Sequence, residues 1–425
     1  MKHRFSGKLA IDGGAPVRTK PLPPSFPGAL VMGAAEKKAV LSVIEAKSPF
    51  RYYGPHLLGK VQRFERQFAG FMDVRYALGV TSGTAALRVA IEALEIGPGD
   101  EVIVPAVTFV ASPNAVICAR AVPVFADVDE TLNLDPADFE RKITRRTRAV
   151  MPVPILGVTP PMDRIRSIAN RHGIAVLEDV AQSCGATFRG RYLGSFGDVS
   201  TFSLQLNKII TAGEGGVVVT GDPVIYERAV RYHDQGQVRK PHADLLGKLR
   251  LKPFAGENYR MSEITGAIAS AQLRKLPSIL RRMRAARAKI EAAVKPLRRL
   301  RPRPSHDRRG DAGSSVMFFL DDPSQARWFV DALRAENLPA FQQYDGTPAY
   351  MFEQVLSKGV VSRVKCPYEC PHYTGRVDYH EGLCPNAEAL LRRTIVLGLT
   401  PVHTVSDLND IITGIRKVYS ALYQA

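Results

Sequence analysis

Seven short apolar runs alternate with segments of helical length between residues 76 and 220, and this alternation constrains the fold most strongly. The runs span residues 76–80, 101–105, 123–127, 149–153, 174–179, 199–203 and 216–220. Residues 84–94, 112–120 and 162–172 are each long enough for a crossover helix. The pattern predicts an α/β fold with a mostly parallel seven-stranded sheet and helices on both faces. Ligands of such sheets bind beyond the carboxyl ends of the strands, so functional residues are expected there.

The rest of the chain predicts an arm before this sheet and a smaller α/β unit after it. Proline and glycine are frequent before residue 50, apart from one helical stretch over 34–45, and a long helical stretch follows at 261–297. We expect an N-terminal arm and first helix over residues 1–50, a large domain over 51–275, and a linking helix with a small C-terminal domain over 276–425.

The small domain has its own alternation of elements. Strands are predicted at 315–320 and 394–399, a helix at 324–336, and a closing helix with Thr404 as N-cap and Asp407 in its first turn. A hydroxyl cap and an early carboxylate are both typical of helix starts.

The chain is basic, with 58 Lys and Arg against 41 Asp and Glu, a net charge of +17 over 425 residues. Such an excess suits nucleic acid, an anionic surface, or an acidic or phosphorylated small molecule. The basic residues are dispersed, apart from one dense run at 298–303, and no basic motif interleaved with aromatic residues occurs. This dispersion disfavours nucleic-acid binding.

Location is indicated by what the sequence lacks. No run of about 18 apolar residues occurs, so no transmembrane helix is expected. The first residues have no apolar segment of the secretory kind, and five cysteines are too few for a disulfide scaffold. We therefore expect a cytoplasmic protein that does not associate with membranes.

Three polar clusters follow predicted strands. Residues 81–84 (Thr-Ser-Gly-Thr) precede a helix, which is typical of a phosphate site and also of an ordinary cap. Glu178 and Asp179 end a central strand; they suit a metal, a ribose, a protonated heterocycle or a merely charged strand exit. Lys208 is the lone lysine of an otherwise uncharged loop before a glycine run. Burial lowers the pKa of such an amine and makes it nucleophilic, as a Schiff base requires.

In this order the clusters resemble the DegT-type aminotransferases, the nucleotide-sugar and aminocyclitol family of fold type I pyridoxal-phosphate enzymes. The resemblance extends over nearly the whole chain. The matching segments are residues 9–14, 50–52, 82–87, 97–109, 178–185, 194–198, 202–216 and 258–263.

The resemblance implies a role for each matching residue. Lys208 would form the Schiff base with pyridoxal 5'-phosphate and move the proton, and Asp179 would keep the pyridinium nitrogen protonated. Gln182 would bind the phenolic oxygen, and Phe109 and Ala181 would contact the two ring faces. The phosphate would be held by Gly83, Thr84, Ser203 and, from the neighbouring subunit of a homodimer with shared sites, Asn258.

Two segments depart from the family pattern. Pro154 stands where many relatives have a histidine, which puts family rules for acceptor binding at that wall in doubt. Residues 232–236 also differ from the shorter form of sugar-nucleotide members, so we do not expect a sugar-nucleotide pocket from the resemblance.

The cysteines Cys366, Cys370 and Cys384, with His372 and His380 between them, raise the question of zinc. Each cysteine precedes a proline, and the first two have the spacing C-x3-C, which favours a proline-rich insertion. We expect no metal.

The resemblance implies an aminotransferase that moves an amino group from L-glutamate or L-glutamine to a keto or aldehyde group of a sugar, cyclitol or related polyhydroxylated acceptor. One alternative is a pyridoxal-phosphate sugar dehydratase. In dehydratases of this superfamily a histidine stands at the position of Lys208. Another is a non-catalytic regulatory protein of the same fold.

Overall fold

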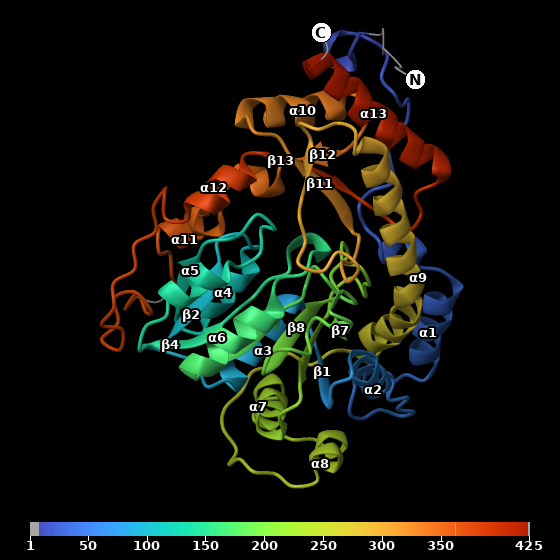
Figure 1. The fold of residues 1–425 in the computed structure, drawn as a ribbon. Helices are drawn as coiled ribbons and strands as arrows, with labels where there is room; N and C mark the ends of the chain where they lie inside the picture. The colour runs from blue at the N-terminus through green and yellow to red at the C-terminus, as the bar shows by residue number, and fades with distance from the viewer. Residues whose placement is uncertain (1–7, 362, 424–425) are drawn as a thin grey trace.

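The computed structural model describes residues 8–361 and 363–423. Its large sheet has the strand order β1-β9-β8-β5-β4-β2-β3 (Figure 1). The strands are β1 (Tyr76–Val80), β2 (Glu101–Pro105), β3 (Val122–Ala126), β4 (Thr147–Val150), β5 (Ala175–Asp179), β8 (Val199–Ser203) and β9 (Gly216–Thr220). Within this sheet β9 pairs antiparallel with β1 and β8, and the other pairs are parallel. The predicted mostly parallel sheet of seven strands is confirmed, with some strand ends shifted by up to three residues.

Helices cover both faces of this sheet, as predicted. The side chains along each strand alternate between the two apolar cores that these helices form with the sheet. Val102 and Val104 of β2 belong to one core and Ile103 to the other. The first core includes α3 (Gly83–Ala93), α4 (Ala111–Cys118) and α7 (Pro223–His233). The second includes α2 (Lys60–Met72), α6 (Met162–His172) and the first part of α9 (Glu263–Val294).

A second, antiparallel sheet carries the C-terminal unit. Its order is β10 (Arg301–Pro302), β11 (Ser315–Phe319), β13 (Thr394–Gly398) and β12 (Ala340–Phe341). A third core joins it to α10 (Pro323–Ala335), α13 (Val405–Tyr423) and the end of α9, including Ile290 and Val294. Because α9 contributes to two cores, it connects the two sheets, as expected of the long helix.

The predicted start of the closing helix is confirmed in atomic detail. Thr404 Oγ1 accepts a hydrogen bond of 3.1 Å from the Asp407 amide, and Asp407 Oδ2 accepts one of 2.8 Å from the Thr404 amide. This reciprocal pair satisfies two amides that the helix itself cannot.

The first part of the N-terminal arm lies against the C-terminal unit, whereas α1 (Ala34–Glu45) lies beside α9 near α2 (Figure 1). Leu9 and Leu22 belong to the third core, and the carboxylate of Glu336 accepts hydrogen bonds from the amides of Ala10 and Val17. The two ends of the described chain therefore meet on one unit. The domain boundaries near residues 50 and 275 stay predictions.

Short elements complete the chain. They are α5 (Pro136–Arg141), β6 (Thr187–Phe188), β7 (Arg191–Tyr192), α8 (Lys240–Leu246), α11 (Glu353–Leu356) and α12 (Pro385–Leu391).

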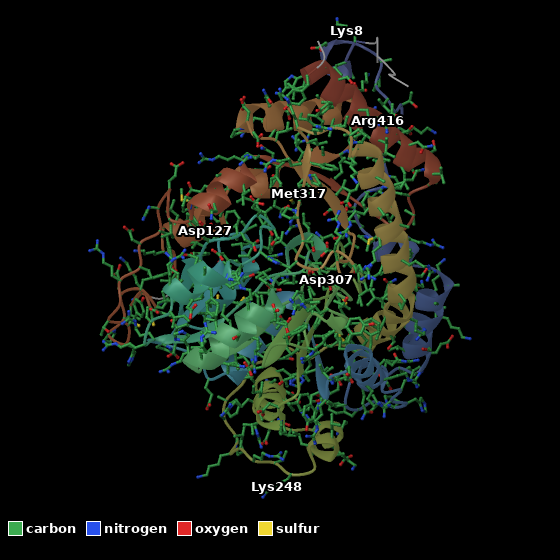
Figure 2. The ribbon with its side chains drawn as sticks, viewed as in Figure 1. Lys8, Asp127, Lys248, Asp307, Met317 and Arg416 are labelled. Atoms are coloured by element: carbon green, nitrogen blue, oxygen red, sulfur yellow. The ribbon has the colours of Figure 1, made fainter. Side chains whose placement is uncertain are left out.

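Some basic side chains lie at the edge of the molecule, whereas apolar side chains pack between its elements. Lys248 and Arg416 extend outward, whereas Met317 on β11 is buried (Figure 2). Over residues 8–361 and 363–423, no helix is both long enough and apolar enough to cross a membrane.

Candidate active site

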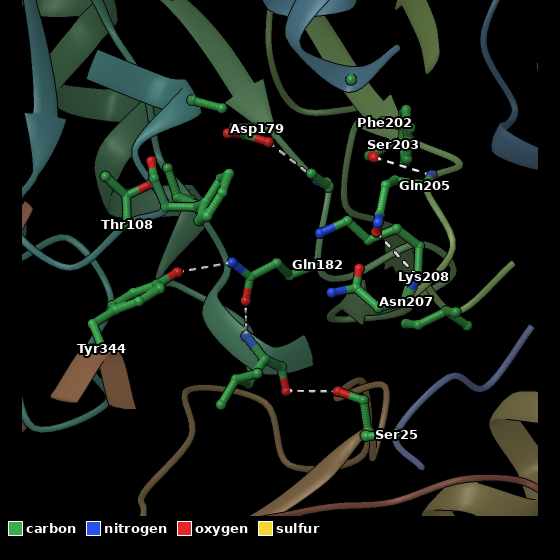
Figure 3. Close-up of a pocket in the computed structure, with 18 of the residues that line it drawn as sticks. Ser25, Thr108, Asp179, Gln182, Phe202, Ser203, Gln205, Asn207, Lys208 and Tyr344 are labelled. Carbon is green, nitrogen blue, oxygen red and sulfur yellow. Dashed lines mark hydrogen bonds between the residues drawn. The ribbon is translucent and has the colours of Figure 1, made fainter. Parts of the chain in front are cut away.

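A cavity of about 700 Å³ lies at the carboxyl ends of β5 and β8, between the large sheet and the C-terminal unit. This is the sheet edge at which the strand pattern predicts ligands. Its wall includes eight of the nine residues singled out in the sequence: Gly83, Thr84, Phe109, Asp179, Ala181, Gln182, Ser203 and Lys208. Figure 3 shows Asp179, Gln182, Ser203 and Lys208 around this cavity. Segments more than 100 residues apart therefore meet in one place.

The start of α3 forms a cradle on one side of the cavity. Ser82 is the N-cap, and its Oγ accepts a hydrogen bond of 3.0 Å from the Ala85 amide. A side chain at Gly83 would place its Cβ 2.7 Å from Cβ of Ser203, so only glycine allows this close approach. The first amides of a helix have no partner within it, and the helix dipole is positive there. The cradle therefore suits an anion of phosphate size.

Asp179 occupies the last position of β5 and is buried. Its Oδ2 accepts a hydrogen bond of 2.8 Å from Ser112 Oγ, and its Oδ1 accepts one of 3.1 Å from the Ala181 amide. Burial raises the pKa of Asp179, and the two hydrogen bonds and the charge of Lys208 oppose that rise. A positively charged ring nitrogen beside this carboxylate would compensate its lost hydration.

Lys208 lies in the loop between β8 and β9. Backbone hydrogen bonds from Leu204 to Gly215 (2.9 Å) and from Ala212 to Leu204 (2.9 Å) close the loop around it. Burial lowers the pKa of the Lys208 amine, and the charge of Asp179 opposes the shift. A lowered pKa increases the fraction of neutral, nucleophilic amine near neutral pH.

The residues expected around a flat ring also line the cavity. Phe109 is 55% exposed although it is a large apolar side chain, which leaves its ring free to contact a ligand. Ala181 is a small residue of the same wall. Gln182 Nε2 lies 3.0 Å from Tyr344 Oη, and its Oε1 accepts a hydrogen bond of 3.1 Å from the Leu156 amide.

Asn258 is the one predicted residue that does not line this cavity. It is exposed, and its Oδ1 accepts a hydrogen bond of 3.3 Å from the Arg260 amide. A role at the cavity of a neighbouring subunit stays a prediction. At the wall where the sequence departs from the family, Val153 and Leu156 face the cavity.

Sequence reasoning missed three residues of the site. The hydroxyl oxygens of Thr108 and Ser112 are 2.6 Å apart, and Ser112 also donates a hydrogen bond to Asp179. The third residue is Tyr344, which contacts Gln182. A serine in the first turn of α4, directly after the strand–loop segment 101–109, was a usable signal for Ser112. No local pattern marks Tyr344, because its partner is 162 residues away in the chain.

The cysteine segment carries two neighbouring thiols. Cys366 Sγ and Cys370 Sγ are 2.8 Å apart, and Cys384 is buried. In the part of the chain that the structure describes, no group of three or more His, Cys, Asp or Glu side chains could hold a metal ion. The absence of metal from this segment stays a prediction.

Two curated relatives match part of the chain. An L-glutamine:2-deoxy-scyllo-inosose aminotransferase of Streptomyces kanamyceticus is 39% identical over 277 residues, 64% of this chain and 64% of the relative. A GDP-perosamine synthase of Vibrio cholerae is 41% identical over 225 residues, 53% of this chain and 59% of the relative. The chain thus spans less than two thirds of the length of either relative.

The structural similarity to solved aminotransferases covers more of the chain than these sequence matches do. A crystal structure of 3-amino-5-hydroxybenzoic acid synthase superposes with a TM-score of 0.80 at 28% identity, covering 96% of this chain and 100% of that one. The fold is therefore that of the fold type I aminotransferases. The model of the DegT/DnrJ/EryC1/StrS aminotransferase family matches residues 33–416. The chain belongs to the DegT/DnrJ/EryC1/StrS aminotransferase family.

Proposed function

We propose that this protein is a pyridoxal-phosphate-dependent aminotransferase. It moves an amino group from L-glutamate or L-glutamine to a keto or aldehyde group of a sugar, cyclitol or related polyhydroxylated acceptor. The observation that carries the proposal is the joint placement of the buried Asp179 and the half-buried Lys208 in one cavity beside the cradle at the start of α3. Family membership and the activities named for the two relatives support it.

The residues present fit this cofactor. The cradle at the start of α3 can accommodate a phosphate in size and charge. Asp179 is a buried carboxylate, and among the described residues it has no cationic partner at hydrogen-bonding distance. When bound, pyridoxal phosphate supplies a ring that accepts the electron pair left when the donor's carbon loses its proton.

Each residue has a separate task in the proposal. Asp179 keeps the ring nitrogen protonated, because an adjacent carboxylate favours the charged form of that nitrogen. Lys208 Nζ would hold the cofactor and would carry a proton between the two carbons beside the transferred nitrogen. Gly83, Thr84 and Ser203 would hold the phosphate, and Phe109 and Ala181 would contact the two faces of the ring.

The acceptor class is supported by further polar residues of the cavity wall. These are amide and carboxylate side chains, namely Gln205, Asn207, Glu214, Gln342 and Asp345. Such groups pair with vicinal hydroxyls by donating and accepting hydrogen bonds. The net charge of +17 would favour an acidic or phosphorylated acceptor, although it is not localised to this wall.

A homodimer with shared sites and a cytoplasmic location belong to the same proposal. Asn258 lies outside the cavity of its own chain, which is consistent with service to a partner. The five cysteines are free thiols, as a reduced compartment would keep them.

The test is the first half of the reaction, which needs no acceptor. Addition of L-glutamine or L-glutamate to the loaded protein should bleach its visible absorbance and release one 2-oxo acid per site. A regulatory protein would bind the cofactor without this conversion. A dehydratase is disfavoured by Lys208, and release of water without amine transfer would identify one.

A further inference from the structure

Tyr344 reaches the cavity from the C-terminal unit and contacts Gln182 of the large sheet. It lies in the 3₁₀ turn Gln343–Gly346, directly after β12, whereas Gln182 follows β5. Figure 3 shows the two side chains pointing toward each other, with Tyr344 Oη 3.0 Å from Gln182 Nε2. The two sheets are therefore joined by a side-chain hydrogen bond in the wall of the proposed cofactor site.

The partners of Gln182 determine which way its amide faces. Its Oε1 accepts a hydrogen bond from the Leu156 amide, and a backbone N–H can only donate. The amide nitrogen must therefore face Tyr344, whose oxygen can accept. The Nε2 group has two protons, so one remains for a ligand in the cavity. If the Gln182 amide were turned by 180°, its Nε2 group would face the Leu156 amide, and two hydrogen-bond donors would then oppose each other.

Both partners are held in a backbone conformation that side chains rarely adopt. Leu156 has φ 50° and ψ 37°, and Tyr344 has φ 50° and ψ 35°. Left-handed geometry in residues other than glycine is unfavourable and is concentrated at functional sites. It is sustained here by buried hydrogen bonds, from Arg303 Nη1 to the Ile155 carbonyl (2.9 Å) and from the Gln343 amide to Thr394 Oγ1 (2.9 Å).

The hydroxyl of Tyr344 stays neutral, because burial raises the pKa of this side chain. A neutral phenol oxygen keeps a lone pair for the Gln182 amide at every pH at which the enzyme would work. The contact is therefore independent of pH in that range.

The geometry points to Tyr344 as a positioning residue that fixes the free Nε2 proton of Gln182 toward the phenolic oxygen of bound pyridoxal phosphate. This inference rests on the proposed function. A fixed donor stabilises the ionised form of that oxygen, so it lowers the apparent pKa of the visible titration of the loaded protein. Tyr344 itself takes no part in the chemistry.

The experiment is a spectrophotometric pH titration of the cofactor-loaded full chain. Tyr344→Phe removes the hydroxyl and keeps the ring, and it should raise the apparent pKa by about 0.5–1 unit, the size expected for a weakened hydrogen bond. Tyr423→Phe is the matched control, because it also removes a tyrosine–glutamine hydrogen bond of the C-terminal unit, the one of 2.7 Å to Gln325. It should leave the titration unchanged.

A second background tests whether Tyr344 acts through Gln182. In Gln182→Ala protein, the further change Tyr344→Phe should shift the titration by less than about a third of its shift in wild type. An unshifted Tyr344→Phe titration, or an undiminished shift in the Gln182→Ala background, would overturn the inference. Thermal melting of each variant verifies folding. If the wild type showed no visible cofactor band, the proposed function itself would fail. That outcome differs from the two titration results that would overturn only the role of Tyr344.

Discussion

Ser112 Oγ donates a hydrogen bond of 2.8 Å to Asp179 Oδ2 and so joins the first turn of α4 to the end of β5. The serine fixes one carboxylate oxygen while the Ala181 amide fixes the other. Asp179 is thus held in one orientation before any ligand arrives. In the proposed enzyme, this preorganisation lets the carboxylate meet the ring nitrogen without reorienting.

Asp179→Asn should retain the cofactor and slow the first half-reaction by at least about a hundredfold, because an amide cannot hold the ring nitrogen protonated. Stopped-flow absorbance after mixing with L-glutamine measures the rate. Ser112→Ala is the comparison: it keeps the carboxylate and should cause a much smaller loss. Near-normal single-turnover transfer in Asp179→Asn protein would remove Asp179 from the proposed chemistry.

The cofactor-free protein should show a stability difference that depends on pH. Burial raises the native pKa of Asp179, so the folded chain holds this proton more tightly than the unfolded chain, whose aspartate titrates near about 3.9. Above the unfolded pKa the wild type therefore loses stability as pH rises toward the native pKa, whereas an asparagine does not.

Denaturant unfolding of apoprotein at pH 4 to 8 measures this effect. The free energy of unfolding of Asp179→Asn relative to wild type should increase with pH over this window and then level off. A difference that stayed constant, or that decreased with rising pH, would contradict the direction given for Asp179.

Asn258→Ala alone should mainly weaken cofactor retention, because an amide that donates to a phosphate oxygen contributes about 1.5–3 kcal/mol. A mixture of Lys208→Ala and Asn258→Ala chains tests the shared site. If Asn258 serves the partner, each hybrid dimer has one intact and one doubly altered site, so activity at limiting cofactor should reappear after subunit exchange. If mixing restores nothing although mass spectrometry detects hybrids, Asn258 does not act across subunits.

The cysteine segment should carry no stoichiometric metal. Cys366 and Cys370 are adjacent, but two further ligands in tetrahedral arrangement would be needed for zinc. Elemental analysis of protein purified without chelators provides the measurement, with Cys366→Ser protein as the control for adventitious binding. One zinc per chain that disappears in Cys366→Ser would reverse this prediction.

The large sheet could be predicted from the sequence because its strands are buried on both faces. Segments such as 102–105 are therefore continuous apolar runs. The seven-stranded sheet was predicted on that basis. β4 begins two residues earlier than predicted because Thr147 and Arg148 are polar residues within the strand, and apolar character alone does not detect them.

The site could be predicted where its residues belong to local segments that match the family pattern. Asp179, Ala181 and Gln182 form one motif, and their common placement around a cavity agrees with it. Tyr344 and the backbone amide of Leu156 contribute through tertiary contacts that leave no spacing to detect. The packing of Leu9 and Leu22 into the C-terminal core could likewise not be predicted from the composition of the N-terminal segment.

The central claim is that the Lys208 amine performs amine transfer, and single-turnover formation of 2-oxo acid from L-glutamine or L-glutamate tests it most directly. Wild type and the surface control Lys240→Ala, which loses only an exposed ion pair to Asp244, should each release one 2-oxo acid per site. Lys208→Ala should fold, as its circular dichroism and melting will verify, and release none on the same timescale. Release by Lys208→Ala at near the wild-type rate would contradict the account.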